Sequence, residues 1–232
     1  MSDELTDQQA FLILNALPNI GPITTNRLLV EFGGEPRAIF SAGARRLESV
    51  RGVGSVISTT IAGWREHFDL AREETKIAKA GVGFVTVRDP GYPPMLKEIY
   101  DPPIGLYRKG SYDFGNPCIA IVGSRRTTLY GQGMAKKLGA ELARLGFCVV
   151  SGLARGIDTA AHTGALSVDG KTAAVLGNGI DIVYPAENLE LFRKIAENGA
   201  VLSEFPFGRR ADKQSFAMRN RIVAGICSAV IV

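Results

Sequence analysis

The chain has 232 residues, of which 46% are hydrophobic and 22% charged, and it carries a formal net charge of +4. A chain of this length can bury a hydrophobic core without disulfides or metal ions, and its 27 glycines and 11 prolines are too few for the disordered or collagen-like classes. Its opening residues are acidic and polar, unlike a signal peptide, and no later run approaches the roughly 18 apolar residues of a membrane span. We therefore expect a cytoplasmic globular protein with no membrane contact.

Residues 1–80 are predicted to form a small all-α domain of the helix-hairpin-helix (SAM-like) type. Segments 17–29 and 50–64 each read as a helix end, a tight turn that contains Gly21 or Gly54, and a new helix. The unpaired N–H groups at the start of such a helix can bind phosphate. The alternative is that both turns serve packing or protein contact, because this part of the chain has no net basic excess.

Residues 81–116 are predicted to be a linker or extended connector between two domains. Five prolines between residues 89 and 116 confine the backbone to extended segments and turns. This segment marks the predicted domain boundary.

Residues 117–232 are predicted to form a Rossmann-like α/β domain. Short runs rich in β-branched and small apolar residues alternate with helical stretches, and the predicted strands are 118–122, 147–151, 172–176, 200–204 and 228–232. Strands that are separated by helices form a parallel sheet with helices on both faces. Ligands of such a sheet bind beyond the carboxyl ends of its strands.

Small and polar residues follow the predicted strands. Gly123-Ser124-Arg125 follows the first strand, and Ser151-Gly152 ends the second. Glycine lets a ligand approach the backbone, serine donates hydrogen bonds, and an arginine can hold a phosphate by two contacts. These residues favour a phosphate-bearing ligand, although a tight strand-to-helix turn alone would also explain Ser151 and Gly152. Motifs for dinucleotide binding, for a P-loop and for a nucleophilic serine are incomplete, so we expect no cofactor.

Positive charge is concentrated just before the last predicted strand. Residues 206–221 contain five basic side chains and one acidic one. Within this stretch Lys213 and Phe216 are three positions apart, so a helical turn would place a cation and an aromatic ring on the same side. Single-stranded nucleic acid is bound by such a combination of positive charge and aromatic stacking. The alternative is that Phe216 anchors the helix in the core and that a nearby arginine pairs with a carboxylate such as Glu204.

Cysteine and histidine give no indication of a metal site. Cys118, Cys148 and Cys227 lack metal-binding spacing and lie in or beside predicted strands, which is typical of buried core residues. His67 and His162 are too few for a histidine-rich site, and we interpret both as surface or packing residues.

Several motifs in combination resemble the DNA-processing protein A (DprA, also called Smf) family. The resemblance as a whole spans nearly the whole chain, including the helical front segment. The motifs are Ile121-Val122-Gly123-Ser124-Arg125, Ser151-Gly152-Leu153-Ala154-Arg155-Gly156-Ile157-Asp158 with Ala161-His162, Tyr184-Pro185, Leu202-Ser203-Glu204, and Phe216 followed by Arg219-Asn220-Arg221-Ile222. The resemblance implies a protein that is not an enzyme, binds single-stranded DNA without sequence preference and loads the RecA recombinase onto it in natural transformation and homologous recombination.

The resemblance also implies which residues bind DNA. Arg125 matches the position that holds a backbone phosphate, Lys213 and Phe216 match the basic and aromatic contacts, and residues 219–221 match the family's RNR motif. The full expected set is Gly123, Ser124, Arg125, Ser151, Gly152, Lys213, Phe216, Arg219, Asn220 and Arg221.

The end of the chain departs from the family pattern. Family members continue beyond the strand predicted at 228–232, so we expect this chain to be shortened at its C-terminus and a homodimer to form when that part is complete. The alternative function is a nucleotide-binding hydrolase of a related Rossmann-like fold, which would use Asp158 or Glu204 as its general acid or base.

Overall fold

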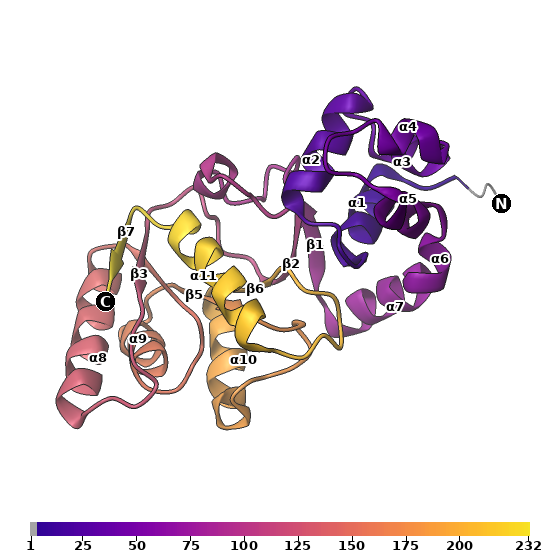
Figure 1. Ribbon diagram of the computed structural model, residues 1–232. Helices are drawn as coiled ribbons and strands as arrows, with labels where there is room; N and C mark the ends of the chain where they lie inside the picture. Colours follow the sequence, from indigo (N-terminus) through magenta and orange to yellow (C-terminus); the bar gives the residue numbers. More distant parts are fainter. Residues whose placement is uncertain (1–3) are drawn as a thin grey trace.

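The computed structural model describes residues 4–232 and contains a helical region followed by a seven-stranded sheet (Figure 1). Residues 1–3 of the acidic opening segment lie outside the described residues. Within residues 4–232 no helix is both long and apolar enough to cross a membrane.

The helical region has the two hairpin turns that the sequence predicts. Gly21 and Gly54 are the residues immediately before α2 and α5, and neither helix start receives a side-chain cap. The helices of this region are α1 (Asp7–Ala16), α2 (Pro22–Glu31), α3 (Pro36–Ser41), α4 (Ala44–Glu48), α5 (Ser55–Ala62), α6 (Trp64–His67) and α7 (Leu70–Ala80).

The sheet has the strand order β1-β2-β6-β5-β4-β3-β7. Its strands are β1 (Gly83–Thr86), β2 (Gly105–Gly110), β3 (Cys118–Ile121), β4 (Cys148–Ser151), β5 (Thr172–Leu176), β6 (Ala200–Ser203) and β7 (Ala229–Ile231). The five strands from β6 to β7 in this order are parallel, whereas β2 pairs antiparallel with both β1 and β6. The predicted α/β fold with a Rossmann-like parallel sheet is therefore confirmed, with an antiparallel extension at one edge.

The segment 81–116, which we expected as a connector, supplies that extension. Its prolines lie between β1 and β2 and not within them, so both strands keep the N–H groups that pair in the sheet. The short 3-10 helix η1 (Met95–Glu98) lies in the loop between them. Proline content alone could not separate a linker from a loop between two paired strands.

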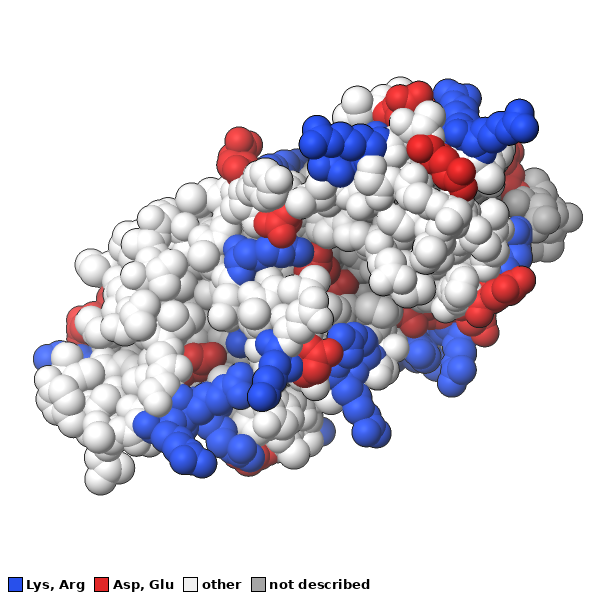
Figure 2. Space-filling view, viewed as in Figure 1, with Lys and Arg blue, Asp and Glu red and all other residues white. Residues whose placement is uncertain are grey.

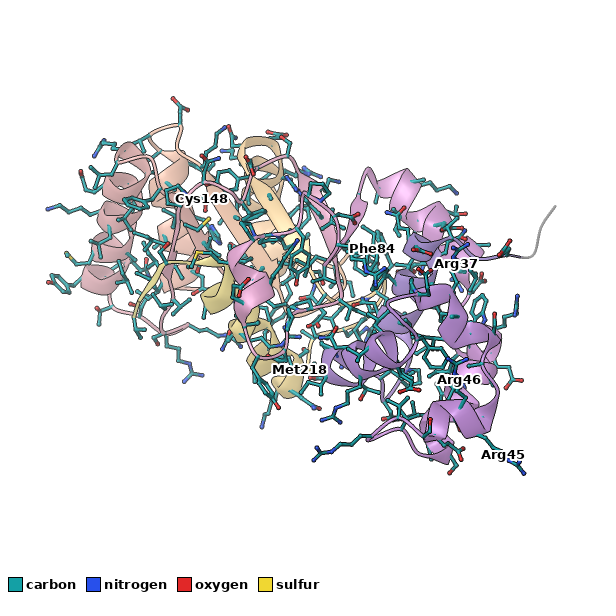
Figure 3. The ribbon with its side chains drawn as sticks, turned by 90° about the horizontal axis from the view of Figure 1, so that it is seen from above. Arg37, Arg45, Arg46, Phe84, Cys148 and Met218 are labelled. Carbon is teal, nitrogen blue, oxygen red and sulfur yellow. The ribbon has the colours of Figure 1, made fainter. Side chains whose placement is uncertain are left out.

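Helices cover both faces of the parallel strands. The helices after β3 are α8 (Leu129–Arg144), α9 (Ile157–Leu166), the 3-10 turn η2 (Ala186–Asn188), α10 (Leu189–Asn198) and α11 (Lys213–Ile226). Neighbouring residues of β4 point to opposite faces: Val149 belongs to the hydrophobic cluster that contains Ala161 of α9, and Val150 to the cluster that contains Ile222 of α11. The three cysteines are free and buried in the α11 cluster, as predicted, and Cys148 is marked in Figure 3.

The helical region shares a core with the edge of the sheet. Phe11 of α1 belongs to the same buried cluster as Phe84 of β1 and Tyr107 of β2, and Phe84 lies where the helices meet the sheet (Figure 3). The buried Glu73 of α7 accepts hydrogen bonds at 2.8 Å from the Tyr107 hydroxyl and from the Phe207 backbone N–H. The helices are thereby attached both to β2 and to the loop that leads to α11.

Helices α8 and α9 approach each other very closely. A Cβ atom at Gly139 of α8 would lie 2.4 Å from the backbone oxygen of Ala161 of α9, which is closer than real Cβ contacts. At Gly133, less than two turns earlier in α8, a Cβ atom would meet nothing within 4 Å. One glycine of the helix is thus required by packing, and the other is not.

Alanine at these two glycines should therefore change stability in opposite directions. Gly133→Ala should raise the free energy of unfolding by about 0.5–1 kcal/mol, because alanine favours the helix and the site is open. Gly139→Ala should lower it by about 1–3 kcal/mol, because the added methyl group forces two helix backbones apart. Urea denaturation of both variants checks this, and equal shifts would contradict the packing.

Candidate functional site

The candidate site lies at the carboxyl ends of β3, β4, β5 and β6, which are neighbours in the sheet. The loop after β3 exposes Gly123, Ser124 and Arg125. The Ser124 hydroxyl accepts a hydrogen bond at 3.1 Å from the Arg126 backbone N–H, and the Ser124 carbonyl accepts one at 3.3 Å from the N–H of Ile157 at the start of α9. These bonds hold the loop at the edge of the sheet while the Arg125 side chain faces solvent.

Helix α11 presents two different faces. Its buried face consists of Ser215, Arg219, Ile222, Val223 and Ile226. Lys213, Phe216 and Asn220 are spaced by three and four residues and form a second face, on which Lys213 and Asn220 are exposed and Phe216 is half-buried. The helix confirms the prediction that Lys213 and Phe216 point the same way.

Arg125, Tyr184 and Phe216 form a stacking cluster at the strand ends. The Arg125 guanidinium carbon lies 4.4 Å from the centroid of the Phe216 ring. The Tyr184 ring is 6.1 Å from the Phe216 ring and tilted by 44°. Arg125 comes from the loop after β3, Tyr184 from the segment after β5, and Phe216 from α11, so only the folded chain brings them together. Tyr184 belongs to one of the motifs that resemble the family but not to the expected DNA-binding set, because a lone tyrosine in a loop has no periodic partner that would indicate its role.

A buried polar layer lies beneath the stacking cluster. Arg219 is only 5% exposed, and its guanidinium donates to the Val175 carbonyl of β5. The guanidinium also lies where a Cβ atom at Gly152 would be, so Gly152 cannot carry a side chain. The buried Asp158 of α9 accepts from the N–H groups of Gly152 and Ala154 at 3.1 and 3.3 Å. Arg219, Gly152 and Asp158 therefore shape the loop after β4 from inside.

Burial acts on the protonation of this layer. It raises the pKa of the Asp158 carboxyl, and the Arg219 guanidinium and the two backbone N–H groups oppose this rise. Burial lowers the pKa of Arg219, and Asp158 opposes that change. Each charge thus offsets part of the desolvation of the other.

Two further residues of the expected set have structural contacts. The Ser151 hydroxyl is buried and donates to the Ile121 carbonyl at 2.6 Å, which links the ends of β4 and β3. Arg221 forms ion pairs with Glu204 at 2.5 Å and with Asp101 at 3.1 Å. Ser151, Arg219 and Arg221 are therefore positioned to support the site from below, with side chains that are engaged in contacts within the protein, and Gly152 leaves room for the Arg219 guanidinium.

Exposed basic side chains occur in the same segments as the stacking cluster, in the loop after β3 and at the start of α11. We call Arg125, Arg126, Arg210 and Lys213 the basic rim; all four are exposed, and within residues 4–232 none of them forms an ion pair with a carboxylate. Figure 2 shows Lys and Arg side chains gathered at the lower end of the sheet, where α11 begins. Phosphate groups are attracted to such a surface.

Asp158 and Glu204, the two carboxylates that a hydrolase would use, are held by contacts within the protein. Asp158 is occupied by backbone N–H groups, and the buried Glu204 is paired with Arg221. Burial raises the pKa of Glu204, and Arg221 opposes this rise. This geometry gives no support to either residue as a general acid or base. In the described part of the chain, no three His, Cys, Asp or Glu side chains are grouped so that they could hold a metal ion.

Several known proteins have similar sequences. The sequence profile of DNA recombination-mediator protein A matches residues 83–232. Protein Smf of Synechocystis is 37% identical over 98% of this chain and 58% of its own length. The DNA processing protein DprA of Streptococcus pneumoniae is 45% identical over 63% of this chain and 52% of its own length. The chain belongs to the DprA/Smf family. It spans little more than half the length of these two relatives.

Solved DprA structures share the fold. The X-ray structure of DprA from Streptococcus pneumoniae matches 99% of this chain and 78% of that chain, with a TM-score of 0.81 and 32% identity. A structure of DprA from Helicobacter pylori, which concerns the single-stranded DNA binding mode of that protein, matches 63% of this chain and 67% of that chain, with a TM-score of 0.57 and 34% identity. The helical region and the sheet of this DprA-family chain therefore both have counterparts in solved structures.

A histidine of this DprA-family chain lies under the site without contacting solvent. His162 of α9 is fully buried, and its Nδ1 lies 2.7 Å from the Thr172 hydroxyl, whereas its Nε2 has no partner among the described residues. Burial, with a smaller effect of Arg219, lowers the pKa of His162 from 6.5 to about 3. His162 is thus a neutral packing residue, as the sequence predicts.

This histidine should make the fold sensitive to acid. Below pH 6.5 the unfolded chain binds a proton at His162 and the folded chain does not. The free energy of unfolding therefore has its full value above pH 6.5 and decreases as the pH falls below 6.5. The slope should approach about 1.4 kcal/mol per pH unit. Urea denaturation between pH 7 and 5 should show this pH-dependent loss of unfolding free energy in the wild type and not in His162→Gln. Parallel pH dependences would contradict the assignment, since Asp158 and Glu204 titrate in both proteins.

Proposed function

We propose that this protein binds single-stranded DNA without sequence preference at the stacking cluster and the basic rim. The observation that carries the proposal is the contact between Arg125 and Phe216, which joins a phosphate-binding cation to an aromatic surface. Single strands expose both phosphates and unstacked bases, and each stacked base contributes about 1–3 kcal/mol. The Helicobacter pylori relative, whose structure concerns its binding of single-stranded DNA, supports the same ligand.

The geometry of the cluster supports stacking without base readout. Arg125 covers the Phe216 ring on one side, and the backbone at Gly177 lies against the ring edge, where a Cβ atom would be 2.9 Å from Phe216 Cδ1. An incoming base therefore stacks on the outer face of the guanidinium or takes its place over the ring. A guanidinium plane and an aromatic ring accept every base, because every base has a π-face.

Substitutions at the exposed Arg125 and Lys213 and at the half-buried Phe216 should weaken binding and leave the fold intact. Arg125→Ala, Lys213→Ala and Phe216→Leu should each reduce affinity for an oligothymidylate by about fivefold or more, and the two charge removals should each lower the salt dependence by about one unit. Arg144→Ala is a matched control, because Arg144 is exposed at the far end of α8 and is paired with Glu141. Fluorescence anisotropy at several salt concentrations measures these effects.

The thermal midpoints of the same variants separate binding from folding. They should stay close to the wild-type value, whereas Arg219→Ala should unfold at a lower temperature, because it leaves the buried Asp158 without its cation. Equal affinity of the wild type for duplex DNA would contradict the role of stacking. Unchanged affinity in all three surface variants would contradict the proposed site.

We further propose that the bound strand is delivered to the RecA recombinase in natural transformation and homologous recombination. Membership of the DNA recombination-mediator family supports this role. A mediator must bind DNA independently of its sequence, and the stacking cluster has the chemical groups for such binding. The proposal requires that DNA binding by this protein and RecA assembly are coupled on the same strand.

RecA activity tests this coupling. The wild type should shorten the lag before RecA hydrolyses ATP on single-stranded DNA that is already covered by a single-strand binding protein, and Arg125→Ala should not. A wild type that binds DNA and leaves the lag unchanged would remove the mediator role and retain DNA binding.

A further inference from the structure

Two surface grooves flank α9, and both are lined by Thr159 and Thr163 of that helix. The first lies between α8 and α9 and has a volume of about 400 Å³. The second lies between α9 and α10 and has a volume of about 670 Å³. A strand that is held at the stacking cluster would meet one or both of them as it continues across the protein.

Charge distinguishes the two grooves. The α9–α10 groove is lined by four carboxylates and a single lysine; Glu187 and Glu190 are paired with Arg155 and Arg193, and Asp169 and Glu197 form no ion pair with another described residue. The α8–α9 groove has no acidic lining residue, and Lys136 provides its charge. The charge of the second groove therefore suits a phosphodiester chain better than that of the first.

The α8–α9 groove is also continuous with the candidate site. One end is lined by Gly156, the residue before α9, and the next residue, Ile157, donates its N–H to the Ser124 carbonyl beside Arg125. Both helices begin at the carboxyl ends of their strands, so their positive dipole ends lie at this mouth. Helices α8 and α9 lie side by side in Figure 1.

The α8–α9 groove contains two exposed polar side chains that could reach a bound strand. Lys136 and Gln132 are exposed, and no hydrogen bond or ion pair joins either side chain to another of the described residues. They are one helical turn apart on α8, and Lys136 lies about 10 Å along the helix from Leu129 at the groove mouth. Gly133 keeps the groove open between them, because it has no side chain to fill the space.

We propose that the α8–α9 groove holds the next part of the single strand, with Lys136 bound to a backbone phosphate and Gln132 to the adjoining sugar or base edge. This inference rests on the proposed function, because it extends the DNA path from the stacking cluster. It assigns the strand a direction across the protein, over α8 and away from the acidic groove beside α10.

The test compares two adjacent lysines on two lengths of DNA. Lys136→Ala should reduce the affinity for a long oligothymidylate by about threefold to tenfold and lower its salt dependence by about one unit. The affinity for a short oligothymidylate that only covers the stacking cluster should change little. Lys137→Ala is the matched control: it removes the same charge from the next residue of α8, which is exposed and does not line the groove.

The outcomes separate this inference from the proposed function. Equal effects of Lys136→Ala and Lys137→Ala on the long oligonucleotide would overturn the groove and leave DNA binding at Arg125 standing. An effect of Lys136→Ala that is equally large on the short oligonucleotide would also overturn it, because the groove would then not be a separate segment of the path. A wild type that binds neither oligonucleotide would overturn both proposals.

Discussion

A buried arginine organises the surface on which the proposed DNA site depends. Arg219 extends from α11 under the strand ends, donates to the carbonyl of Val175, and lies near Asp158, whose carboxylate binds the N–H groups of the loop after β4. A charge in this position is costly to bury alone, and the two opposite charges each reduce the desolvation cost of the other. Arg219 attaches α11 to β5, and Asp158 holds the loop after β4 through its backbone N–H groups. Because α11 is held in this way, Phe216 is presented at the surface where Arg125 reaches it.

The RNR motif shows how one helical turn serves both structure and surface. Arg219 faces the interior, Asn220 faces solvent, and Arg221 pairs with Glu204 and Asp101. Successive residues of a helix are separated by about 100°, so three adjacent polar residues necessarily point in three directions. The two arginines stabilise the position of α11, and the exposed face is left to Lys213, Phe216 and Asn220.

The helical region is attached to the antiparallel edge of the sheet and to the segment that follows β6, where Asn15 of α1 donates to the Glu204 carbonyl at 2.7 Å. Its core is continuous with β1 and β2, and Glu73 joins α7 both to Tyr107 and to the loop before α11. The helix starts after Gly21 and Gly54 receive no side-chain cap, and Pro22 at the first position of α2 has no N–H group to donate. The antiparallel pair β1-β2 thus has a structural role, because it extends the parallel sheet and gives the helical region an apolar edge to pack against.

The sequence by itself determined the alternation of strands and helices from residue 117 onward, because hydrophobic runs and glycine turns are local signals. It also located the loop at Arg125 and the shared face of Lys213 and Phe216, since both follow from local spacing. The pairing of β1 and β2 with the sheet was decided only by tertiary structure, as was the contact of Tyr184 with Phe216. Tertiary structure also decided which arginine is buried. Nothing local in the sequence separates Arg125 from Arg219, but the packing of α11 on β5 buries Arg219 and leaves Arg125 in solvent. Contacts between segments far apart in the chain leave no periodic pattern in the sequence. The exposure of the site residues and the residues that they contact therefore became visible only in the fold.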